Sequence, residues 1–220
     1  MKYQSIDSHR KGYGTISLKE EPKDPKMKYY QLDLDFNELL KETARVYAQW
    51  KEQIECRYEH MQPRVDPTLS KNTYNLITLS TPLPTYYQLW KQVFANIKEY
   101  YGGDYKHLWI HSWLNVHRSP ELNGVNESLG WHLHDYCNHH GFVHLSDKET
   151  DTEFKNGTVI KNKQGQMYMG DSRLEHRVVS CNFKGLRASI GFDILHNPNP
   201  GAFVQQVLDS GALPQMVPIL

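Results

Sequence analysis

The C-terminal half of the chain carries polar residues whose order suits a metal ion with an anion-binding group beside it. His132 and His134 are separated by one residue, so on a strand both imidazoles point to the same side and can bind one divalent metal. A third candidate, His176, stands where a further strand is expected to open. Beyond it, Arg187 and Ser189 share a strand face, and a guanidinium beside a hydroxyl suits the distal carboxylate of a dicarboxylic acid. Because the chain has 12 histidines, the ordered set is more specific than any pair within it.

Other polar residues close to this set have weaker claims on the chemistry. His144 would be either a donor to the site or an ordinary buried residue, and Asn115 would either line a cavity or support the fold. Asp135 could supply a carboxylate only if its strand twisted or bulged. His139 and His140 are interpreted as surface residues of a loop.

The hydrophobic pattern predicts the strands that position these residues. In 108–116 apolar side chains alternate with a polar-aromatic set, so one face would pack in the core and the other would line a cavity. Loops rich in Gly, Asn, Asp and Ser separate the further predicted strands, which are 130–136, 141–146, 157–161, 166–169, 175–181 and 187–195.

The N-terminal half has helical periodicity instead. Apolar residues recur every three or four positions from Phe36, which predicts a helix with Asp35 as its N-cap. A second helix is predicted after Pro84 and ends at Gly102, whereas 62–83 is expected to be a loop. Two helices followed by about seven short strands predict helices packed outside a β-sandwich or barrel.

The composition excludes several classes of function. Lys and Arg number 25 and Asp and Glu number 25, so a net charge of zero gives no overall field toward nucleic acid or an anionic membrane. Cys56, Cys137 and Cys181 have no CxxC spacing, which argues against a disulfide framework or a structural zinc site. No apolar run is long enough for a signal peptide or a membrane span, so we expect a cytoplasmic protein, or one of the host cytoplasm or virion if viral.

The order of the candidate residues resembles a known superfamily. The series His-x-Asp/Glu, His and Arg-x-Ser is typical of the Fe(II)/2-oxoglutarate-dependent dioxygenases, and 108–195 resembles it. The runs 112–116 (Ser-Trp-Leu-Asn-Val), 132–134 (His-Leu-His) and 141–145 (Gly-Phe-Val-His-Leu) resemble in particular the small 2-oxoglutarate oxygenases of phage and marine bacteria. The resemblance implies that Fe(II) is the metal, that 2-oxoglutarate is the co-substrate, and that the fold is a double-stranded β-helix.

One position departs from the superfamily. His134 stands where most members have Asp or Glu, and three neutral imidazoles would leave Fe(II) with its full charge. Three-His iron sites are found in thiol and diketone dioxygenases. The predicted metal ligands, which are also the predicted catalytic residues, are His132, His134 and His176. The predicted cofactor-binding residues are Arg187, Ser189, His144 and Asn115.

We therefore expect a mainly β protein with flanking helices (α+β), whose core is a double-stranded β-helix of the jelly-roll or cupin-like kind with two N-terminal helices packed on it. The whole of 1–220 is expected to be a single domain. Its expected parts are an N-terminal arm (1–35), a helical support region (36–104), the β-helix core (105–196) and a C-terminal tail (197–220).

The expected function is hydroxylation of a small-molecule or protein substrate, with the second helix and the 62–83 and 118–130 loops shaping the pocket. Two alternatives stay open. One is a three-His cupin-like dioxygenase that does not use 2-oxoglutarate, against which Arg187 and Ser189 argue. The other is a non-catalytic structural or adaptor protein, for example of a viral particle, because the arm and the tail would suit a homo-oligomer or larger assembly. No nucleic-acid or membrane partner is expected.

Overall fold

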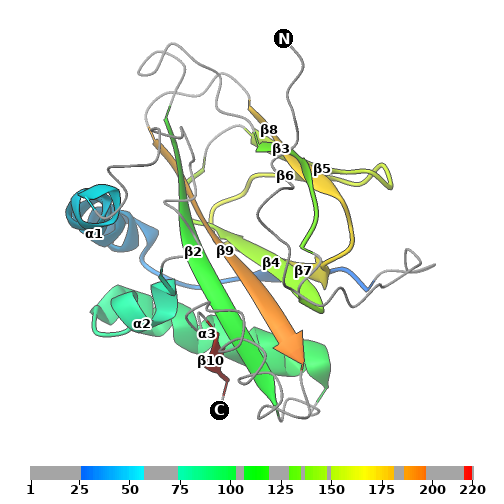
Figure 1. The fold of residues 1–220 in the computed structure, drawn as a ribbon, viewed down its shortest axis with the longest axis horizontal. Helices are drawn as coiled ribbons and strands as arrows, with labels where there is room; N and C mark the ends of the chain where they lie inside the picture. Colours follow the sequence, from blue (N-terminus) through cyan, green and yellow to red (C-terminus); the bar gives the residue numbers. More distant parts are fainter. Residues whose placement is uncertain are drawn as a thin grey trace.

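The computed structural model places three helices against one face of a large β-sheet, with a smaller sheet on the other side (Figure 1). The helices are α1 (Phe36–Cys56), α2 (Leu76–Ser80) and α3 (Pro84–Tyr101). Among the described residues, no helix has both the length and the apolar character that crossing a bilayer requires. The structure describes residues 26–56, 74–102, 107–118, 129–134, 137–147, 150–180, 186–196 and 216–219.

All strand pairs in the two sheets are antiparallel. The large sheet has the order β1-β7-β4-β9-β2-β10, and the small sheet has the order β3-β8-β5-β6. In the large sheet the strands are β1 (Lys28–Gln31), β2 (Leu108–Arg118), β4 (His139–His144), β7 (Gln166–Asp171), β9 (Leu186–His196) and β10 (Val217–Pro218). In the small sheet they are β3 (Leu129–His132), β5 (Thr150–Phe154), β6 (Val159–Lys161) and β8 (His176–Ser180).

Eight of these strands form nested pairs. β2 pairs with β9, β3 with β8, β4 with β7, and β5 with β6, so the chain from β2 to β9 runs as one long hairpin folded over on itself. Successive pairs alternate between the large sheet and the small sheet, which is the topology of a jelly roll, or double-stranded β-helix. The predicted fold class is therefore confirmed.

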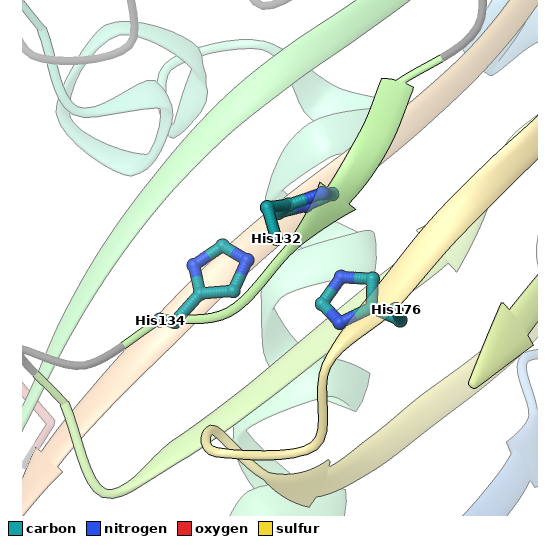
Figure 2. Close-up of side chains that lie close together, drawn as sticks. All are labelled: His132, His134 and His176. Atoms are coloured by element: carbon teal, nitrogen blue, oxygen red, sulfur yellow. The ribbon is translucent and has the colours of Figure 1, made fainter. Parts of the chain in front are cut away.

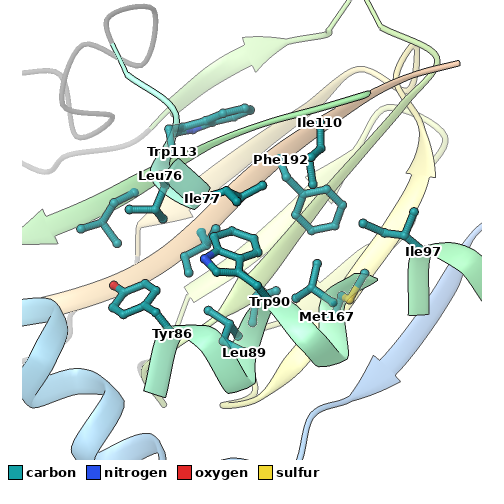
Figure 3. Close-up of a cluster of buried hydrophobic side chains, with 14 of the residues drawn as sticks. Leu76, Ile77, Tyr86, Leu89, Trp90, Ile97, Ile110, Trp113, Met167 and Phe192 are labelled. Atoms are coloured by element: carbon teal, nitrogen blue, oxygen red, sulfur yellow. The ribbon is translucent and has the colours of Figure 1, made fainter. Parts of the chain in front are cut away.

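Alternation along β9 separates the core from the candidate site. Phe192 and Ile190 point toward the helices and are fully buried there, whereas Arg187, Ser189 and Asp193 point toward the small sheet. Figure 3 shows the helix side of this arrangement, where α3 packs its apolar stripe against the large sheet. Since α3 covers the face away from the histidines, the expectation that the second helix shapes the pocket is wrong.

The helix ends follow the predicted chemistry, but the short elements α2, β5 and β10 were not foreseen. Asp35 caps α1 by accepting a 3.0 Å hydrogen bond from the Glu38 backbone N–H, and Gly102 ends α3 with a φ of 65°. The predicted 62–83 loop contains α2, because Asn75 both caps this helix and donates to the Ile110 carbonyl of β2. Strand β5 was missed because its buried face is made partly of threonine rather than of purely apolar residues.

Gly141 on β4 lies where the large sheet leaves no room for a side chain. A Cβ added there would overlap the Phe192 ring and lie 2.6 Å from the Tyr168 carbonyl oxygen. Gly141→Ala is therefore expected to lower the free energy of unfolding by about 1–3 kcal/mol, measured by urea denaturation. Gly130→Ala is the matched control, since no atom lies within 4 Å of its added Cβ. Equal stability of the two variants would contradict the packing described for β4 and β9.

Candidate metal centre

Three histidines converge at the end of the small sheet. His132 closes β3 and is the direct cross-strand partner of His176, which opens β8, and His134 follows two residues beyond β3 (Figure 2). The ring centroids of His132 and His176 are 4.4 Å apart, and that of His134 is 5.4 Å from each. One ligand nitrogen of each imidazole lies within 4.8 Å of the others, so the three could hold one metal ion.

The turn between β7 and β8 fixes this end of the site. Arg173 donates two hydrogen bonds to the Asp171 carboxylate, at 2.9 and 2.7 Å, which ties the turn together. The backbone carbonyl of Ser172 accepts from the His134 N–H at 3.0 Å, while the Ser172 hydroxyl donates to the Cys137 carbonyl at 2.6 Å. The turn that presents His176 therefore also holds the segment that carries His134.

Hydrogen bonds set the same tautomer in all three imidazoles. Nδ1 of His132 lies 2.7 Å from the Gly130 carbonyl oxygen, and Nδ1 of His176 lies 2.9 Å from the Leu174 carbonyl oxygen. Nδ1 of His134 lies 3.2 Å and 3.0 Å from the two oxygens of the Asp193 carboxylate. Carbonyl and carboxylate oxygens only accept, so each Nδ1 carries the proton and each Nε2 keeps a lone pair. An imidazole with its proton on Nδ1 can bind a divalent metal through Nε2, so the three residues fit one.

Burial favours the neutral form of two imidazoles of this region, His140 and His176. Loss of solvent, together with the neighbouring His140 and His132, holds the pKa of His176 well below its ordinary value. Burial lowers the pKa of His140 to about 3, although its bond to Asp193 opposes the shift. Neutral imidazole is the form that binds metals, so His176 does not need to lose a proton before an ion enters.

Two residues of this region escaped the sequence-based prediction. His140 is 5% exposed and donates from Nδ1 to Asp193 at 2.8 Å, so its interpretation as a surface residue is wrong. His139 is also partly buried, and its Nδ1 lies 2.5 Å from the Tyr101 hydroxyl on the helix side of the sheet.

The second residue that the prediction missed is Asp193, which is fully buried. Asp193 follows Ser189 by four residues and Arg187 by six, so alternation along a strand places it on the same face as both. That spacing was the signal that could have revealed Asp193 in the sequence. Asp135 lies outside the described residues.

An indole covers the inner side of the histidine cluster. The Trp113 ring stacks on the rings of His134 and His140, at centroid distances of 5.8 and 6.0 Å. Trp113 is 3% exposed and stands opposite Gly191 in the register of β2 and β9. The indole therefore excludes water from one side of the cluster, which strengthens the electrostatic interactions there.

The predicted cofactor-binding residues lie together on the face of the large sheet that points toward the small sheet. Ser189 is the cross-strand partner of both Asn115 on β2 and His144 on β4. Arg187 stands two residues before Ser189, is 2% exposed and is close enough to His144 to lower its pKa. The Nε and Nη1 atoms of Arg187 and both ring nitrogens of His144 have no hydrogen-bond partner among the described residues. The structure therefore brings these four residues together on the face of the large sheet that also carries His140 and Asp193.

His144 should make the metal-free protein sensitive to acid. Burial, with Arg187 as a second cause, lowers the pKa of His144 to about 3 in the folded chain, against about 6.5 when unfolded. Between these values the unfolded chain binds a proton that the folded chain does not, so stability falls as the pH drops from about 6.5 toward 3. His144→Phe removes this contribution. Between pH 7 and pH 5, the free energy of unfolding of this variant should therefore fall by about 2 kcal/mol less than that of the wild type. Urea denaturation at both pH values measures the difference.

The exposed His107 gives the control for this measurement. His107 has a φ of 77°, which asparagine tolerates, so His107→Asn should lose as much stability as the wild type between the two pH values. A His144→Phe variant that behaved in the same way would contradict the assignment of a buried, neutral imidazole.

Comparison with known proteins gives likenesses in structure only. No protein-family model and no curated protein matches the sequence. AviO1 from Streptomyces viridochromogenes has a TM-score of 0.49 at 12% identity, over 78% of this chain and 90% of that protein. The viral collagen prolyl hydroxylase of Paramecium bursaria Chlorella virus-1, solved as a 2OG complex, has a TM-score of 0.37 at 13% identity, over 49% and 70%. A cupin domain from Bordetella pertussis has a TM-score of 0.31 at 15% identity, over 39% and 81%.

Because each of these TM-scores is below 0.5, the fold class rests on the nested strand pairing. Fold and site together define a cupin-like jelly-roll protein with a cluster of histidines that could hold one metal ion. The buried Arg187 lies on the face of the large sheet that points toward the small sheet.

Proposed function

We propose that the chain is a non-haem Fe(II) oxygenase that uses 2-oxoglutarate and hydroxylates a small-molecule or protein substrate. The observation that carries the proposal is the state of Arg187. Its guanidinium is buried, and two of its nitrogens have no hydrogen-bond partner among the described residues. A buried cation without an anion is costly, and burial already lowers the pKa of Arg187 to about 10. A bound carboxylate would supply the missing partner.

The neighbours of Arg187 favour a dicarboxylic 2-oxo acid over a lone anion. Ser189 offers a hydroxyl on the same strand face, and His144 offers ring nitrogens that have no hydrogen-bond partner in the part of the chain that the structure describes. A ligand gripped by its distal carboxylate at Arg187 would extend along the sheet face toward the histidines, where its 2-oxo acid end would meet the metal. Guanidinium and carboxylate form two parallel hydrogen bonds, which would orient such a ligand as well as bind it.

In this proposal the chain's own residues bind, orient and exclude water. His132, His134 and His176 would hold Fe(II) through Nε2, and Arg187 with Ser189 would hold the co-substrate. Trp113 covers the inner side of the imidazoles and would keep bulk water from the reacting groups. Bound Fe(II) would supply the redox chemistry by which O2 oxidises 2-oxoglutarate to succinate and CO2 and hydroxylates the substrate.

The test is an anaerobic titration of the Fe(II)-loaded protein with 2-oxoglutarate. We expect the visible charge-transfer absorption that arises when a 2-oxo acid chelates Fe(II), followed by succinate formation once O2 is admitted. Pyruvate is the matched control ligand, because it keeps the 2-oxo acid group but lacks the distal carboxylate, and it should bind much more weakly. A protein that holds iron but gives neither signal would refute the use of 2-oxoglutarate.

A three-His dioxygenase that does not use 2-oxoglutarate is the second candidate. The observation that favours it is His134 itself, an imidazole where a carboxylate is usual. That candidate predicts oxygen uptake with an organic substrate in the absence of 2-oxoglutarate. A protein that binds no metal at all would favour a structural or adaptor role instead.

A further inference from the structure

The carboxylate missing from the predicted ligands is present nearby, on a different strand. Asp193 on β9 is fully buried, and its carboxylate accepts hydrogen bonds from Nδ1 of His134 and Nδ1 of His140. His140 is its cross-strand partner on β4, and the two imidazoles stack with centroids 3.8 Å apart. One buried negative charge therefore stands directly behind one of the three candidate ligands.

We propose that Asp193 is a positioning residue of the metal site that acts through His134 from outside the ligand shell. By accepting the Nδ1 proton of His134, it turns the Nε2 lone pair toward the metal and fixes the plane of the ring. Its negative charge would lie behind the His134 imidazole that holds the metal and would partly offset the charge that three neutral ligands leave uncompensated. This inference rests on the metal site of the proposed function and extends it.

His140 has a distinct part in this arrangement. A carboxylate buried from water needs more than one donor to remain charged, and His140 supplies the second N–H at 2.8 Å. The pair of imidazoles therefore satisfies the Asp193 carboxylate and fixes it in place.

The alternative is that Asp193 binds the metal itself. Its oxygens and one ring nitrogen each of His134 and His140 also lie within 4.8 Å of one another. Two observations favour the outer role. All three residues of that second set are at most 5% exposed, so an ion there would have little access to O2 or to a 2-oxo acid, whereas His132 is partly exposed. In addition, both imidazoles point a protonated nitrogen, not a lone pair, at the carboxylate.

Asp193→Asn tests the proposal because it keeps the shape of the side chain and removes the charge. Competition with a chromogenic chelator should show Fe(II) affinity falling by about 10–100-fold, the usual loss when an outer-shell partner is removed. The Fe(III)/Fe(II) midpoint potential should rise, since the oxidised ion loses a nearby negative charge. Glu153→Gln is the matched control: this carboxylate of the small sheet pairs with Arg177, and neither quantity should change. Equal affinity and potential in the two variants would overturn the proposal.

A measurement on the wild-type protein tests the proposal even if the Asp193→Asn variant does not fold. In the cobalt(II)-loaded protein, each ligand histidine that keeps its Nδ1 proton should give a hyperfine-shifted, exchangeable N–H resonance, including His134. If the exchangeable proton of His134 were assigned to Nε2–H instead of Nδ1–H, its Nδ1 would be the metal ligand and the proposal would fail.

A last comparison separates this inference from the proposed function. If His132→Ala retained the metal while His140→Ala lost it, Asp193 would be a ligand and the inference would be wrong. If Asp193→Asn behaved as expected but the protein ignored 2-oxoglutarate, the inference would stand and the proposed oxygenase activity would fall.

Discussion

Replacing His132 or His176 by alanine is expected to remove most of the metal that the wild-type protein binds. The two imidazoles face each other across β3 and β8, and each has its Nδ1 proton bonded to a backbone carbonyl, which leaves Nε2 for the ion. Loss of a ligand should cost more than the roughly 100-fold that loss of an outer-shell partner costs. Metal analysis after anaerobic Fe(II) loading and desalting gives the stoichiometry, and chelator competition gives the affinity.

A control variant and a double variant test whether the lost metal was bound at this site. The exposed His107 lies outside the cluster, so His107→Asn should retain about the wild-type amount of metal. The double variant His132→Ala, His176→Ala should retain none at that site. If the double variant kept stoichiometric metal, the ion would be bound elsewhere and the site assignment would be wrong.

The second large effect is expected at Arg187. Arg187→Ala should leave Fe(II) binding nearly unchanged and weaken 2-oxoglutarate binding by about 2–5 kcal/mol, which is roughly one and a half to four decades in the dissociation constant. Arg187→Lys should restore only part of the loss, because an ammonium cannot form the two parallel hydrogen bonds of a guanidinium. Anaerobic titration of each Fe(II)-loaded variant measures both quantities.

A stability measurement shows whether Arg187 is there to bind a ligand. In the ligand-free protein its buried guanidinium lacks full pairing among the described residues. Arg187→Met, which keeps most of the side-chain length without the charge, should therefore unfold no more easily than the wild type while binding 2-oxoglutarate as poorly as Arg187→Ala. Arg177, on the outer face of the small sheet beside Glu153, is the control, and Arg177→Ala should bind the ligand normally. Equal 2-oxoglutarate binding by wild type and Arg187→Ala would refute the anchor.

The parts of the fold that local periodicity encodes were predicted well. Burial of Leu108, Ile110 and Leu114 on one face of β2 follows directly from alternation, and α1 begins after the predicted cap at Asp35. Alternation also places Arg187 and Ser189 on one side of β9. The period of a strand or helix is a property of neighbouring residues, so it can be read without knowing what the element packs against.

The sequence by itself therefore determined the ordered set of His132, His134, His176 and Arg187 and the strands that carry three of them, although the strand predicted over 130–136 ends at His132 and leaves His134 beyond it. Only the tertiary structure decided what stands behind the ligands. Asp193 meets His140 through the register between β4 and β9, and it meets His134 in the segment that follows β3. Register depends on the packing of whole sheets, so His140, which was interpreted as a surface residue of a loop, is buried and hydrogen-bonded to Asp193 once the strands are side by side.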